Sequence, residues 1–221
     1  MVRVLDRLGV AMEYPADQTC CGQPAFNSGF RGEARDAAKR FIEIFEEAET
    51  IVCPSGSCVD MVRNHYADLF RNDSRWLERA RHVAGKTFEF SEFLVDVLEV
   101  EDVGASFAER VTYHDSCHLM RGIGVSRQPR ALIARVKGID FVEMHDADRC
   151  CGFGGAFSFK YPDISTAMLE DKVRNINASG ARMVIGCDMG CLMNIQGILN
   201  RKHINIKTMH IAELLDHDTQ S

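Results

Sequence analysis

Residues 143–155 read EMHDADRCCGFGG, and residues 13–22 read EYPADQTCCG. Both stretches hold a Cys-Cys-Gly tripeptide that follows a glutamate at the same distance. A shift of 130 residues superimposes the two stretches, and a shift of 133 residues places Cys58 on Cys191. The two copies share their cysteines while most other residues differ, so this internal repeat predicts two structural units of one kind.

Hydrophobic patterning around the two tripeptides alternates between helical and strand periods. Strands separated by helices predict a parallel α/β arrangement, with the cysteines at the ends of strands. We therefore expect an α/β fold of two pseudo-repeated parallel halves, residues 1–105 with a helical linker at 72–105, and residues 106–221. The expected strands are 9–14, 50–53, 109–118, 139–144 and 181–187, and the expected helices are 1–8, 31–49, 59–70, 129–138, 166–180 and 188–199.

The first copy is expected to be incomplete. In the second copy Cys117 stands 33 residues before Cys150, and the matching position in the first copy would precede residue 1. The N-terminal half then lacks its opening strand and its opening cysteine, through truncation, a late start codon or divergence. An in-frame cysteine a short way upstream in the genomic reading frame would support truncation.

Composition narrows the class of protein. The 221 residues carry a formal net charge of −6, which does not favour binding to nucleic acid or to an anionic membrane surface. No apolar run is long enough for a membrane span, and the first residues do not resemble a signal peptide. We expect a cytoplasmic protein. Thiols stay reduced in the cytoplasm, and the number of cysteines, nine, is odd, so both facts argue against a disulfide framework.

The cysteines cluster at five places, which favours metal ligands over scattered core residues. Adjacent cysteines point in different directions and suit two metal atoms of one cluster better than one small ion. The glycines after the second pair allow close approach of the backbone to inorganic sulfide. These features favour an iron–sulfur cluster in the second copy. Its candidate ligands are Cys117, Cys150, Cys151, Cys187 and Cys191, and the weaker first constellation consists of Cys20, Cys21, Cys53 and Cys58.

Other interpretations stay open at this stage. His114 and His118 flank Cys117 and would suit zinc, although five thiols exceed the four ligands of a structural zinc site. Metal-free thiol catalysis is a further alternative. An ordinary ferredoxin domain is excluded, because its compact Cys-x-x-Cys-x-x-Cys run is absent. The first constellation is either a second cluster site or a degenerate copy kept for architecture.

The cysteine pattern resembles the cysteine-rich CCG domain family, which includes the B subunit of heterodisulfide reductase and the iron–sulfur subunits of glycolate oxidase and anaerobic glycerol-3-phosphate dehydrogenase. More narrowly, the chain resembles the lactate utilisation protein A (LutA) group over nearly its whole length. The strings that carry this resemblance are TCCGQPAFNSG (19–29), CPSGSC (53–58), YHDSCHLMRGIG (113–124), RCCGFGGAFSFKYP (149–162) and GCDMGCLMNI (186–195).

The resemblance implies a cofactor and a role. In the heterodisulfide reductase relatives, five cysteines hold a non-cubane [4Fe-4S] cluster, and the second-copy cysteines match these ligands by position. Where those relatives have Cys-x-x-Cys, this chain has Asp188 and Ser55 at the first place, which leaves the type and number of clusters open.

The implied role is that of an electron-transfer subunit of an oxidoreductase complex rather than a complete enzyme. The complex would oxidise L-lactate to pyruvate with two partners, one of which carries ferredoxin-type clusters. A catalytic disulfide reductase like heterodisulfide reductase, and a zinc-binding interaction module without redox activity, are the alternatives. No catalytic residue is assigned.

Overall fold

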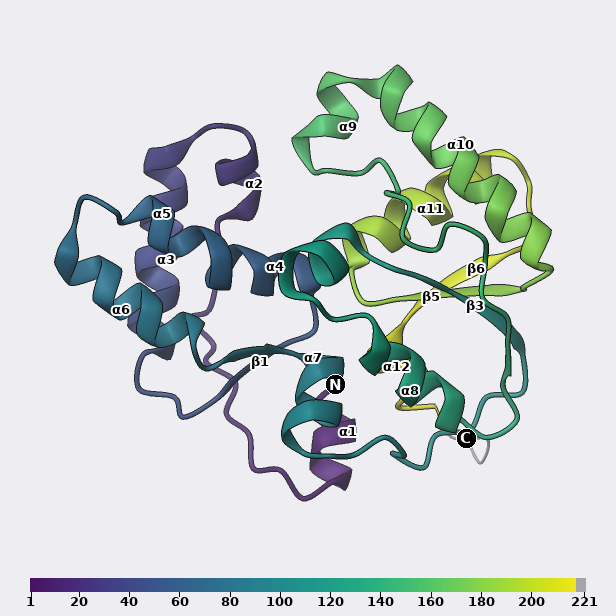
Figure 1. The fold of residues 1–221 in the computed structure, drawn as a ribbon, viewed down its shortest axis with the longest axis horizontal. Coiled ribbons are helices and arrows are strands. Elements are labelled where there is room, and N and C mark those ends of the chain that lie inside the picture. The colour runs from purple at the N-terminus through teal and green to yellow at the C-terminus, as the bar shows by residue number, and fades with distance from the viewer. Residues whose placement is uncertain (218–221) are drawn as a thin grey trace.

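Two parallel sheets organise the chain in the computed structural model, which describes residues 1–217 (Figure 1). A two-stranded sheet pairs β1 with β2, and a four-stranded sheet has the order β4-β3-β5-β6, with every pairing parallel. The mixed α/β architecture with parallel sheets confirms the predicted class. The strands are β1 (Ile51–Cys53), β2 (Thr87–Glu89), β3 (Arg110–His114), β4 (Asp140–Phe141), β5 (Met183–Gly186) and β6 (Lys207–His210).

Helices pack around both sheets. Those of the first part are α1 (Val2–Arg7), α2 (Gln23–Asn27), α3 (Arg31–Phe45), α4 (Gly56–Asp60), η1 (Met61–His65), α5 (Tyr66–Leu69), α6 (Ser74–Ala84), α7 (Phe90–Glu92) and η2 (Phe93–Val97). Those of the second part are η3 (His118–Gly122), α8 (Arg127–Arg135), α9 (Ala156–Lys160), α10 (Pro162–Ser179), α11 (Met189–Arg201) and α12 (Ile211–Leu214). None of the helices within residues 1–217 is long and apolar enough to cross a membrane.

Three strands differ most clearly between the prediction and the structure. The expected strand 9–14 is an irregular, mostly exposed segment, because no neighbouring strand pairs with it. The expected helical linker contains β2, whose pairing with β1 through Ile51 and Thr87 overrides its weak local pattern. β6 was not predicted, because its sequence KTMH is short and has no alternating apolar pattern, so that only its pairing with β5 defines it.

Strand β5 separates two hydrophobic cores. Val184 packs with α10 and α11 on one face, whereas Ile185 and Cys187 pack on the opposite face with β3 and α8. This alternation follows from the two-residue period of a strand. Figure 1 shows α10 and α11 on one side of the sheet and α8 and α12 on the other. A side chain's position in this alternation therefore decides which core it enters.

The first part of the chain contributes to two cores. Helices α3, α5 and α6 enclose one of them, in which the Tyr66 hydroxyl donates to the Cys21 carbonyl at 2.9 Å. Leu5 of α1 and Phe90 of α7 pack instead against the four-stranded sheet. The segment that links the two sheets is therefore anchored on the second one.

Glu89, the last residue of β2, carries a fully buried carboxyl group. One oxygen accepts hydrogen bonds from the backbone N–H groups of Ser91 and Glu92, at 2.7 and 3.3 Å, and caps α7. The other oxygen has no hydrogen-bond partner among the described residues. Burial raises the pKa of Glu89 to about 7, because the charged form is poorly solvated there.

Replacing Glu89 by Gln tests this burial through the pH dependence of stability. A group whose pKa rises on folding, here from 4.5 to about 7, stabilises the fold below its unfolded pKa and loses this effect as the pH rises through its folded pKa. The unfolding free energy of the original protein relative to Glu89→Gln should thus fall by roughly 3 kcal/mol between about pH 4 and pH 8. Urea unfolding of both proteins under reducing conditions measures this difference, and a pH-independent difference would contradict the prediction.

Candidate metal centre

The two Cys-Cys-Gly turns share a glycine in the left-handed region and a hydrogen bond from its N–H to sulfur. Gly152 has φ +77° and Gly22 has φ +88°, a left-handed region that disfavours side chains. A Cβ on Gly152 would lie 2.7 Å from the Ser165 carbonyl oxygen of α10, and one on Gly22 would lie 3.1 Å from the Ala34 carbonyl oxygen of α3. In both turns the glycine N–H donates to the sulfur of the first cysteine at 3.4 Å. The glycine is thus required both for the turn and for close packing on the following helix.

Four thiols of the second copy lie together beyond the carboxyl ends of the strands. Cys117 follows β3, the pair Cys150–Cys151 lies in the loop before α9, and Cys191 stands in the first turn of α11. Cys117 contacts Cys150, Cys150 contacts Cys151, and Cys151 contacts Cys191. Residues from three separate segments therefore form one group of sulfur donors.

The crowding of these thiols perturbs their acidity. Hydrogen bonds from Cys117 and Cys151 lower the pKa of Cys150 to about 2. A hydrogen bond from Cys151 lowers the pKa of Cys191 to about 6. The pKa values of Cys117 and Cys151 are raised, chiefly because each donates to Cys150. The protons that neighbouring thiols share thus keep the negative charge of the group low. A bound metal cation would replace these protons, because metal ligands must be deprotonated.

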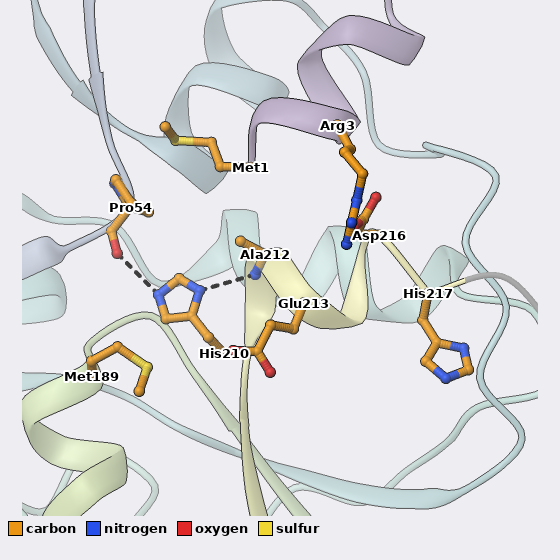
Figure 2. A pocket seen from close by; sticks show the side chains of 9 residues that line it. All are labelled: Met1, Arg3, Pro54, Met189, His210, Ala212, Glu213, Asp216 and His217. Carbon is orange, nitrogen blue, oxygen red and sulfur yellow. Dashed lines mark hydrogen bonds and ion pairs between the residues drawn. The ribbon is translucent and has the colours of Figure 1, made fainter. Parts of the chain in front are cut away.

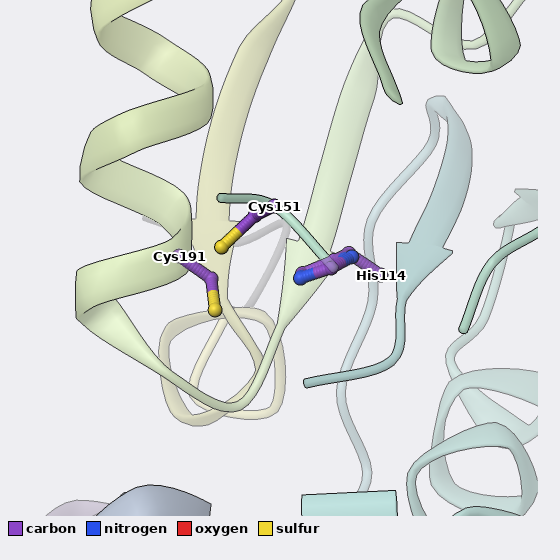
Figure 3. Close-up of side chains that lie close together, drawn as sticks. All are labelled: His114, Cys151 and Cys191. Carbon is purple, nitrogen blue, oxygen red and sulfur yellow. The ribbon is translucent and has the colours of Figure 1, made fainter. Parts of the chain in front are cut away.

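His114 joins this group, although the sequence argument treated it only as a zinc alternative. It ends β3 and is 1% exposed, and one of its ring nitrogens lies within 4.8 Å of the sulfurs of Cys151 and Cys191 (Figure 3). Tyr113 faces the opposite core, so the two-residue period of β3 could have placed His114 on the metal side. The Nδ1 of His118 lies 3.7 Å from the Cys117 sulfur, and its Nε2 lies 4.0 Å from the Asp60 carboxylate.

Cys187 lies apart from the other four second-copy thiols. Its sulfur is 3.3 Å from the Tyr113 hydroxyl, in the core on the opposite face of β5, and it is fully buried. Burial raises the pKa of this thiol. The expected group of five thiols is thus four in the structure, because Cys187 enters the same core as Ile185, whereas Cys191 of α11 lies in the core on the other face of the sheet.

The first constellation forms a smaller group. Cys58 contacts both Cys21 and Cys53, and their hydrogen bonds lower the pKa of Cys58 to about 3. Cys20 is exposed. In the second copy the matching Cys150 is covered by Cys117, and the described residues hold no counterpart of Cys117 here.

A seam of hydrogen bonds joins the two constellations. Asp188 caps α11 and also accepts hydrogen bonds from the Ser57 N–H at 3.1 Å and the Ser55 hydroxyl at 3.3 Å. His210, at the end of β6, lies 3.0 Å from the Pro54 carbonyl oxygen. The turn between Cys53 and Cys58 is therefore fixed against the edge of the four-stranded sheet.

A cavity of about 480 Å³ lies beside this seam (Figure 2). Its lining mixes Arg3, Glu213 and Asp216 with the apolar side chains of Met1 and Met189. None of the nine cysteines lines it. The thiol group is thus distinct from this cavity.

Comparison with known proteins identifies the family. The model of the cysteine-rich domain (CCG) family matches residues 1–63 and 111–196, segments that contain all nine cysteines. The chain belongs to the cysteine-rich CCG domain family. The two matched segments of the CCG domain correspond to the regions around the two Cys-Cys-Gly turns.

Two relatives that are similar over nearly the whole chain are lactate utilization proteins. Lactate utilization protein A of Bacillus subtilis (strain 168) is 48% identical over 97% of this chain and 90% of its own length. Lactate utilization protein A 2 of Bacillus cereus (strain 03BB102) is 45% identical over 97% of this chain and 89% of its own length. The resemblance to this group of the CCG family is thereby confirmed.

A buried lysine supports the second CCG turn. Lys172 of α10 is fully buried, and its ammonium donates to the carbonyl oxygens of Asp146 and Ala147 at 2.7 and 3.0 Å. Burial lowers the pKa of Lys172 to about 8. These bonds fix the loop that leads into Cys150.

Substituting Lys172 by Met should destabilise the protein, because two carbonyl groups lose a charged donor while the aliphatic chain is kept. We expect a loss of about 1–3 kcal/mol in the unfolding free energy, measured by urea unfolding followed by circular dichroism. The control is Lys202→Met, which removes an exposed lysine paired with Glu170 and should cost less than about 0.5 kcal/mol. Equal stabilities of the two variants would contradict this role of Lys172.

Proposed function

We propose that the chain is the iron–sulfur electron-transfer subunit of a complex that oxidises L-lactate to pyruvate. The observation that carries this proposal is the convergence of four thiols from three segments at the edge of a parallel sheet, in a chain homologous to lactate utilization protein A. The ligands would be Cys117, Cys150, Cys151 and Cys191, and the cofactor would be a [4Fe-4S] cluster of the cubane or the non-cubane type.

The donor set fits such a cluster. The four contacting sulfurs are soft ligands of the kind that iron–sulfur clusters require. Gly152 leaves its N–H beside the sulfur of Cys150, where a hydrogen bond would stabilise a thiolate ligand. A bound cluster supplies one-electron transfer, and the chain's own residues hold it, exclude water from Cys151 and Cys191, and fix the loop before Cys150.

The remaining features of the role are proposed on the same basis. The partners would be a subunit with ferredoxin-type clusters and a third subunit of the lactate utilisation complex. The cytoplasm would be its compartment, because nine free thiols suit a reducing environment.

The architecture would be two pseudo-repeated halves, residues 1–105 and 106–221. The two-stranded first sheet, beside a four-stranded second one, supports this division. The group of Cys21, Cys53 and Cys58, together with the exposed Cys20, would either hold a second cluster or be a degenerate copy kept for architecture.

Zinc is the second candidate, and His114 favours it. One imidazole and two thiols within 4.8 Å of one another are the donor types of structural zinc sites. In this case the chain would be an interaction module without redox activity.

Metal analysis of anaerobically purified protein tests the proposal. We expect iron and acid-labile sulfide in the original protein, and their loss in Cys151→Ser. The matched control is Cys187→Ser, which changes an equally buried cysteine on the opposite face of β5 and should keep the iron. Stoichiometric zinc without sulfide, or unchanged iron in Cys151→Ser, would contradict the proposed centre.

Activity assays separate the two redox roles. The electron-transfer role predicts lactate-dependent electron flow only when the partner subunits are present. Cleavage of a disulfide substrate by the chain alone would instead support the catalytic disulfide reductase.

A further inference from the structure

His114 is a buried histidine whose ring nitrogens lack the usual polar partners. It is 1% exposed, and among the described residues neither Nδ1 nor Nε2 is hydrogen-bonded outside the thiol group, where the Cys191 thiol interacts with the ring. A neutral imidazole has one donor and one acceptor, and leaving both unpaired in a protein interior is costly. Such a side chain in a well-packed core requires an explanation.

His210 provides an internal comparison. The parallel register places His114, Gly186 and His210 side by side at the carboxyl ends of β3, β5 and β6. The Nδ1 of His210 accepts from the Ala212 N–H at 3.1 Å, and its Nε2 lies 3.0 Å from the Pro54 carbonyl oxygen. Both nitrogens of His210 are thus used in the fold, whereas the described partners of His114 are thiols of the candidate centre.

The position of His114 shows what it can bind. One ring nitrogen lies within 4.8 Å of the sulfurs of Cys151 and Cys191, and the three side chains point toward a common space from β3, the CCG loop and α11 (Figure 3). All three residues are buried, which excludes an exposed, adventitious grouping. Imidazole nitrogen and thiolate sulfur both coordinate iron and zinc.

We propose that His114 is a direct nitrogen ligand of the metal centre, so that the centre has mixed nitrogen and sulfur ligation. The proposal rests on the proposed function for the nature of the centre. His114 takes the fifth donor place, for which Cys187 was the predicted ligand, because the Cys187 thiol lies on the opposite face of the sheet. A neutral imidazole in place of a thiolate makes the centre less negative and raises its reduction potential, as histidine ligation does in Rieske centres.

The experiment uses the full chain, purified without oxygen and labelled with ¹⁵N-histidine or left unlabelled. Pulsed EPR of the reduced protein should show a strongly coupled nitrogen whose signal changes from ¹⁴N to ¹⁵N with the label. Iron-edge X-ray absorption should show a nitrogen neighbour beside sulfur. A cluster without a directly bonded nitrogen would overturn the proposal, including the case in which His114 only donates a hydrogen bond to sulfur.

Two variants complete the test. His114→Cys replaces the imidazole ligand by a thiolate. This variant should therefore retain iron, lose the nitrogen signal and have a lower reduction potential. His210→Gln should keep the nitrogen signal. An unchanged signal and potential in His114→Cys would contradict ligation by His114.

The failure of the proposed function gives a different result. If the protein holds zinc and no sulfide, the electron-transfer role fails. Zinc-edge X-ray absorption then tests ligation by His114. A nitrogen neighbour of zinc that is lost in His114→Cys would support that ligation. A protein that binds neither metal overturns both proposals.

Discussion

The parallel alignment of β3, β5 and β6 is the constraint on which the candidate centre depends. Parallel strands end at the same edge of a sheet, so the segments that follow them are brought together even when they are far apart in the chain. His114 pairs with Gly186 at this edge, which places the turn with Cys117 beside the start of α11 with Cys191. The CCG loop then covers the edge, held by Lys172. The sheet thus assembles donors that no local motif could bring together.

Side-chain alternation then selects which donors take part. Cys187 and Cys191 are close in sequence, yet Cys187 leaves β5 on the face of Tyr113, whereas Cys191 stands on the first turn of α11. The same alternation in β3 turns Tyr113 to one core and His114 to the other. The composition of the group therefore follows from strand geometry rather than from the number of cysteines nearby.

Much of this architecture could be predicted from the sequence, because strong signals are local. The helix periodicity of α3 and α10 and the Cys-Cys-Gly repeat indicated a parallel α/β fold with cysteines at strand ends. β2 and β6 were missed, since short strands are defined by their partners. His114 was underestimated, because its burial and its lack of hydrogen bonds outside the thiol group are properties of the assembled core. The separate place of Cys187 likewise required the register of β5.

On our proposal, the edge of the four-stranded sheet holds a metal centre on Cys117, Cys150, Cys151 and Cys191. Anomalous diffraction at the iron absorption edge, from crystals grown without oxygen, tests this centre most directly. We expect an iron peak within bonding distance of these four sulfurs and on the α11 side of β5. A peak beside Cys187 and Tyr113, or no iron at this edge of the sheet, would contradict it.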